Sequence, residues 1–183
     1  MPSGKDRLYV ALYARGGAPT MPGLEDTYHW SFIVGPKTEG IHSRGSRFHA
    51  VEKIVENDQS GPKAAWAYEE REIGMEPTSM LLVRIMIAKV KSVRRLRSLF
   101  EGVPVRPDVV GWNCVGWIKE ALEAALSDGK ALGTSASDWE SVRDTAMWYV
   151  ETKKAAHRFD GKGHYDSKVA ATWDMMQGVE LTP

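Results

Sequence analysis

The single cysteine of the chain, Cys114, is the residue best placed to do chemistry. It stands in the segment 111–117 (GWNCVGW), where a pattern of apolar residues at helical spacing begins and predicts a helix over 114–126. A thiol in the first turn lies near the positive end of the helix dipole and near free backbone N–H groups, and both lower its pKa. The position therefore predicts a reactive thiolate, with the N–H groups available to a developing oxyanion. A small buried structural cysteine is the alternative interpretation.

A thiol nucleophile needs a base, and two histidines lie in segments that predict strands. His29 belongs to residues 28–34 (YHWSFIV) and His49 to residues 46–55 (SRFHAVEKIV). An imidazole held rigidly in a strand suits a general base, so we interpret His29 as the base and His49 as the group that orients it. Hydrogen-bonded structural histidines are the alternative. The predicted substrate-binding residues flank these groups: Trp30, Trp112, Asn113 and Trp117.

Other polar groups carry weaker signals. Glu69, Glu70 and Glu72 could supply acid–base carboxylates, but nothing in the sequence fixes their geometry. Basic residues between 89 and 97 are typical of a solvated helix face. No phosphate-binding glycine motif, HExxH sequence or paired-cysteine spacing occurs, so we expect no metal and no other cofactor.

The elements that must position these residues follow from hydrophobic periodicity. The first half alternates with a period of two, and the second half has helical spacing. The predicted strands are 7–14, 28–34, 46–55, 64–73 and 80–90, and the predicted helices are 92–101, 114–126 and 137–157. Asn113 is the expected cap of the second helix, and Ser137 with Glu140 the expected capping box of the third. Strands followed by helices predict an α+β fold, with a mainly antiparallel sheet of about five strands and helices packed on one face.

Composition limits the classes of function. The chain has 183 residues, which predicts a single domain over 1–183, with a core at about 7–157 and a docked C-terminal tail at 158–183. Lys plus Arg and Asp plus Glu are both 24, so we expect no nucleic-acid partner. No apolar run reaches the roughly 20 residues that span a bilayer. A polar N-terminal segment and one cysteine predict a cytoplasmic protein without a disulfide.

The order of the candidate residues resembles a known fold. A histidine in an early strand (YHWSFIV), a polar residue in the next (RFHAV) and a cysteine that opens a later helix (NCVGWIKEAL) resemble the circularly permuted papain-like fold. That group includes the lecithin:retinol acyltransferase family and relatives of bacterial cell-wall peptidases. The resemblance covers roughly residues 28–126 and implies Cys114 as nucleophile, His29 as base and His49 as orienting residue. The whole chain also looks like a group of fungal proteins of unknown function.

Three functions are compatible with these residues. The first is a cysteine-dependent acyl-transfer enzyme, a hydrolase or acyltransferase, acting on a small-molecule or peptide substrate in an aromatic-lined cleft. The alternative is a small-molecule-binding cyclase or isomerase of a biosynthetic pathway that uses His29 as acid or base without covalent catalysis. The third is an interaction module without catalysis. The sequence leaves the oligomeric state open.

Overall fold

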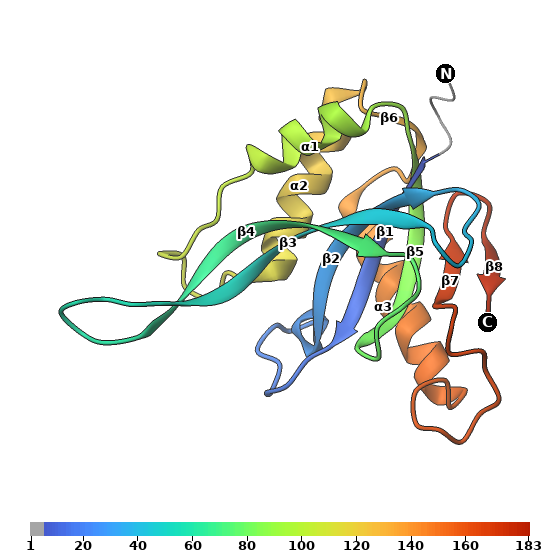
Figure 1. Ribbon diagram of the computed structural model, residues 1–183, viewed down its shortest axis with the longest axis horizontal. Helices are drawn as coiled ribbons and strands as arrows, with labels where there is room; N and C mark the ends of the chain where they lie inside the picture. Colours follow the sequence, from blue (N-terminus) through green and yellow to red (C-terminus); the bar gives the residue numbers. More distant parts are fainter. Residues whose placement is uncertain (1–5) are drawn as a thin grey trace.

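The computed structural model describes residues 6–183, which form an α+β fold of eight strands and three α-helices (Figure 1). The strands are β1 (Asp6–Ala14), β2 (Tyr28–Pro36), β3 (Arg44–Val55), β4 (Lys63–Gly74), β5 (Leu81–Val90), β6 (Leu132–Ser135), β7 (Ala171–Asp174) and β8 (Val179–Thr182). The helices are α1 (Val93–Glu101), α2 (Cys114–Asp128) and α3 (Trp139–Ala155).

All strands within residues 6–183 join one mixed sheet, in the order β4-β3-β2-β1-β5-β7-β8, with β6 also paired to β5. Neighbouring strands are antiparallel except β5 and β7, which run parallel. The prediction of about five strands is therefore wrong, and the sheet is mainly but not wholly antiparallel. The strands that the sequence did not reveal are β6, β7 and β8, of four residues each, and a segment so short shows little alternation.

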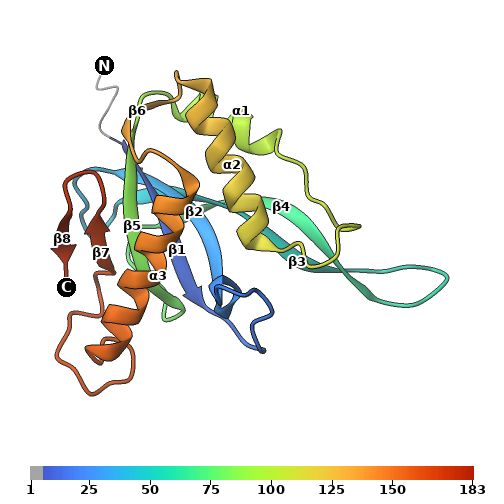
Figure 2. The same ribbon diagram turned by 180° about the vertical axis from the view of Figure 1, so that it is seen from behind.

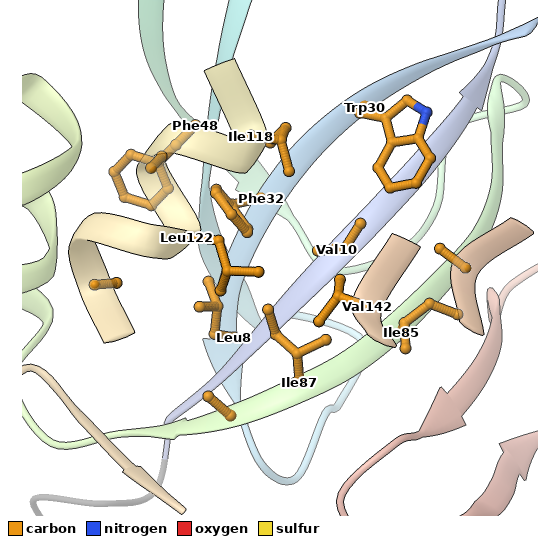
Figure 3. Close-up of a cluster of buried hydrophobic side chains, with 14 of the residues drawn as sticks. Leu8, Val10, Trp30, Phe32, Phe48, Ile85, Ile87, Ile118, Leu122 and Val142 are labelled. Carbon is orange, nitrogen blue, oxygen red and sulfur yellow. The ribbon is translucent and has the colours of Figure 1, made fainter. Parts of the chain in front are cut away.

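The helices pack on one face of the sheet and enclose the main core there (Figures 2 and 3). Alternation along β1 places Leu8, Val10 and Leu12 on this face, all fully buried. Opposite them lie side chains of all three helices, among them Phe100 of α1, Ile118 and Leu122 of α2 and Val142 of α3. Burial of this large apolar face drives the sheet and helices together.

The other face of the sheet has a smaller apolar cluster that loops cover rather than helices. Its buried members are Tyr9, Ala11, Tyr13, Ile33, Met75 and Met86. Met75 comes from the connection after β4, and its backbone N–H bonds the carbonyl of Ser43 at 2.9 Å. Two glycines make room for it, because a Cβ at Gly35 or Gly45 would lie within 2.6 Å of the Met75 side chain. This second face carries the polar groups described below.

The predicted helix caps are partly confirmed. The Asn113 side chain accepts a hydrogen bond from the backbone N–H of Val115 at 3.0 Å and caps α2. Helix α3 is capped instead by Asp138, whose carboxylate accepts from the N–H of Ser141 at 2.7 Å. Ser137 donates to that carboxylate, so the expected capping box is replaced by an Asp cap one residue later.

The C-terminal segment is bound to the rest of the chain through β7, β8 and several polar contacts. Tyr149 of α3 donates a hydrogen bond to Glu180 at 2.7 Å, and Lys153 forms an ion pair with the same carboxylate. Arg158 bonds the carbonyl oxygens of Val169 and Pro183. Among residues 6–183, no helix is long and apolar enough to cross a membrane.

Candidate functional site

His29, His49 and Glu69 form a continuous hydrogen-bonded chain across three strands. Nε2 of His29 lies 2.8 Å from Nδ1 of His49, and Nε2 of His49 lies 3.0 Å from a carboxylate oxygen of Glu69. His49 and Glu69 are direct cross-strand partners in β3 and β4. Strands β2 and β3 pair only near Phe32 and Phe48, so His29 lies where they diverge (Figure 1). The divergence lets its ring reach across to His49.

Burial and charge set the protonation of this chain. The hydrogen bond from His49, with that from Lys53, lowers the pKa of Glu69 to about 2, so the carboxylate is ionised. Burial lowers the pKa of His49 to about 4, although Glu69 acts in the opposite direction. Burial also lowers the pKa of His29 to about 3, assisted by charge on His49 and Arg47. Both imidazoles are therefore neutral at physiological pH.

The carboxylate determines the tautomers of both neutral rings. An ionised Glu69 can only accept, so Nε2 of His49 must carry the proton and its Nδ1 must be an acceptor. Nε2 of His29 then donates to that Nδ1, which leaves the lone pair of His29 on its own Nδ1. Within residues 6–183 this Nδ1 has no hydrogen-bond partner. The arrangement presents one unprotonated nitrogen, oriented by two groups behind it, which is the geometry of a general base, but a pKa of about 3 makes it a weak base in the resting protein.

Cys114 is the first residue of α2 and is fully buried. Burial raises the pKa of its thiol, although the backbone N–H of Trp30 acts in the opposite direction. The expectation of a lowered pKa is therefore wrong in this structure, because removal from water outweighs the helix start. The contact with Trp30 places the thiol beside β2 in the helix-covered core, whereas the neighbouring His29 ring lies against Tyr13 on the other face of the sheet. No hydrogen bond joins Cys114 and His29 in the described part of the chain.

A pocket of about 350 Å³ opens beside the histidines. It is lined by Arg15, His29, His49, Val51, Glu52 and Trp66. Only two histidines meet a single acidic partner here, and residues 6–183 hold no group of His, Cys, Asp and Glu suited to a metal ion.

Comparison with protein families finds one match that spans almost the whole chain. Residues 5–182 match DUF6914, a family of unknown function. The chain belongs to this family. No curated protein and no solved structure matches the chain.

The other predicted site residues of this DUF6914 chain take different positions. Trp30 and Trp117 are fully buried core residues, and the indole of Trp30 donates to the carbonyl of Glu25 at 2.8 Å. Trp112 packs edge-on against Trp66, with ring centroids 5.6 Å apart. Asn113 is committed to its cap, which occupies the N–H of Val115 that could otherwise hold an oxyanion.

The sequence does not reveal the places that three further residues take in this site of the DUF6914 chain. Glu69 was one of several candidate carboxylates, and only the register of β3 against β4 selects it. Arg15 and Trp66 line the pocket, although no sequence pattern marks either residue as part of a site. Strand alternation could have placed Glu69 and Trp66 on opposite faces of β4, but not opposite particular residues of β3.

Proposed function

We propose that this DUF6914 protein is a cysteine-dependent acyl-transfer enzyme, a hydrolase or acyltransferase, with Cys114 as nucleophile and His29 as base. It would act on a small-molecule or peptide substrate in the cytoplasm. The observation that supports the proposal is the hydrogen-bonded order Glu69, His49, His29. It leaves a lone pair on Nδ1 of His29. The Cys114 thiol contacts the backbone of the next residue along β2, Trp30, from the opposite face, so attack requires the thiol and the His29 ring to meet where β2 and β3 diverge.

The reaction follows from the protonation states. Nδ1 of His29 takes the thiol proton as the sulfur of Cys114 attacks the acyl carbonyl, and the resulting imidazolium is stabilised through His49 by the Glu69 carboxylate. The tetrahedral intermediate collapses to a thioester while the leaving group takes the proton from His29. Water or an amine, deprotonated by the same nitrogen, then attacks the thioester and releases Cys114.

Burial of the thiol has a consequence for this mechanism. The resting pair is a neutral thiol and a neutral imidazole, so proton transfer must accompany attack on the substrate. The substrate must also displace whatever covers the thiol. Trp112 lies over the first turn of α2, since a Cβ at Gly116 would be 3.0 Å from its indole nitrogen, and Trp66 contacts Trp112. Movement of this indole pair would connect the thiol with the pocket.

Intact-mass spectrometry with p-nitrophenyl acetate tests the proposal, because the chain has one cysteine. Native wild-type protein should acquire one acetyl group on Cys114. His29→Gln should acquire it at least about tenfold more slowly, as loss of a general base costs roughly a hundredfold or more. The matched control is His42→Gln, an exposed histidine, which should behave as the wild type. Equal rates in His29→Gln and wild type would refute the proposal. So would native protein that neither becomes acetylated nor releases p-nitrophenol while the urea-unfolded chain reacts.

A second candidate function is favoured by the full burial of Cys114 and its lack of a hydrogen bond to His29. In this case His29 acts as acid or base on a bound small molecule without a covalent intermediate, as in a cyclase or isomerase. A folded Cys114→Ala protein that turns over the ester as fast as wild type, while His29→Gln does not, would select this function over the first.

A further inference from the structure

A second pocket, of about 230 Å³, lies on the loop-covered face of the sheet. Tyr13 lines it, and the Tyr13 ring contacts the His29 ring with centroids 6.1 Å apart. Arg47 also lines it, with its guanidinium carbon 5.6 Å from the Tyr13 ring centroid. The pocket therefore adjoins the histidine chain through Tyr13, and it shares no lining residue with the 350 Å³ pocket.

Three arginines line this second pocket, and their pairing differs. Arg44 is paired with Glu72 at 2.9 Å, and Arg84 with Glu39 at 2.8 Å. Among residues 6–183, the only carboxylate paired with Arg47 is that of Glu69, at 4.0 Å.

That carboxylate is already engaged, with one oxygen bonded to His49 at 3.0 Å and the other paired with Lys53 at 3.2 Å. Nε of Arg47 is fully buried and has no hydrogen-bond partner among residues 6–183. The side chain as a whole is 18% exposed, so the terminal nitrogens of a guanidinium without a close carboxylate partner remain able to bind an anion that enters the pocket.

The rest of the lining specifies the kind of anion. Ile33, Met75 and Leu81 make one wall apolar. Glu72 and Glu76 also line the pocket and would repel a second negative charge. A group with a single charge and a short apolar portion fits this combination better than a phosphate, which carries nearly two.

We infer that the second pocket binds an organic carboxylate, held by the guanidinium of Arg47, with its apolar portion against Ile33, Met75 and Leu81. If the proposed function holds, this carboxylate belongs to the substrate, which is then an acyl compound with a free carboxylate, anchored by Arg47 while its carbonyl reaches His29. Binding of a carboxylate in the pocket does not depend on that reaction.

Methyl NMR of Cys114→Ala protein labelled at the methionine methyl groups tests the binding by itself, since this variant cannot form a thioester. Assignment of the Met75 signal comes from Met75→Leu. Hexanoate should shift the Met75 signal with saturation, whereas hexanamide and inorganic phosphate should bind at least about tenfold more weakly. Arg47→Gln should weaken hexanoate at least about tenfold, and Arg47→Lys, which keeps the charge but loses the fork, should fall between.

Arg44→Gln is the matched control, because that guanidinium is already paired with Glu72, and it should change affinity by less than about threefold. The inference is overturned if hexanoate gives no saturable shift, if hexanamide or phosphate binds as well as hexanoate, or if a folded Arg47→Gln protein binds it unchanged. Hexanoate binding together with failure of Cys114 acetylation would overturn the proposed function and leave the carboxylate pocket standing.

Discussion

Lowering the pH should destabilise this protein well before its carboxylates titrate, because two histidines are buried in neutral form. The pKa values of His29 and His49 are about 3 and about 4 in the folded chain, against an ordinary value of 6.5. As the pH falls below 6.5 the unfolded chain therefore binds two protons that the folded chain does not. The stability is fully present above that pH and is lost progressively toward pH 4 and then 3.

Each such proton changes the free energy of unfolding by about 1.4 kcal/mol per pH unit. Between pH 6.5 and pH 5 the two histidines together should cost about 3 kcal/mol, because each is half protonated in the unfolded chain at the upper pH, and this is a large part of the 5–15 kcal/mol typical of a domain. The variant His29→Gln removes one of the two titrations, so its loss over the same interval should fall to about 2 kcal/mol. The matched control His42→Gln should lose as much as the wild type.

Urea unfolding followed by far-UV circular dichroism at pH 8, 7, 6 and 5 measures these free energies. The slope with urea concentration should stay constant, which shows that the same surface is exposed at each pH. A wild-type stability that does not change from pH 7 to pH 5 would refute the neutral, buried pair. So would a His29→Gln protein with the same pH dependence as the wild type.

Three further variants probe the covered thiol and the local packing. Trp112→Ala should speed iodoacetamide labelling of native Cys114 at least about tenfold, because a thiol reacts only when the reagent can reach it and the indole limits that access. An unchanged rate would show that the Trp112 indole does not cover the thiol. Gly45→Ala should lower the free energy of unfolding by about 1–3 kcal/mol in urea titrations, because its Cβ would lie 2.5 Å from the Val34 carbonyl oxygen; full stability would contradict the close packing. Asn113→Ala should cost about 1 kcal/mol through loss of the α2 cap in the same assay, and Asn113→Ser should restore most of it.

Much of the fold can be predicted because its long elements have clear periods. Leu8, Val10 and Leu12 alternate and lie on one buried face of β1, and the helix predicted over 114–126 is α2, Cys114–Asp128. The short strands escape because their pairing depends on what lies beside them. Ala171–Asp174 is a strand because it pairs with β8 and with a parallel edge of β5 that lies far away in the sequence.

The candidate site, like the fold, can be predicted from the sequence only in part. His29 and His49 can be recognised as strand histidines, and the structure joins them by a hydrogen bond. Selection of Glu69 depends on a strand register that residue types do not fix. The protonation of Cys114 depends on its burial, which raises the thiol pKa and outweighs both the helix start and the backbone N–H of Trp30. Local position therefore identifies the thiol but gives the wrong direction for its pKa.

The central claim is that Glu69 and His49 leave the lone pair of His29 on its Nδ1, where it can act as a base. Long-range proton–nitrogen NMR of the labelled imidazoles at pH 7, with signals assigned by His29→Gln and His49→Gln, tests it most directly. We expect His29 and His49 both to be neutral and protonated on Nε2, and Glu69→Gln, which can donate as well as accept, to weaken this preference in both rings. A His29 ring protonated on Nδ1, or charged on both nitrogens, would show that Glu69 and His49 do not set this tautomer.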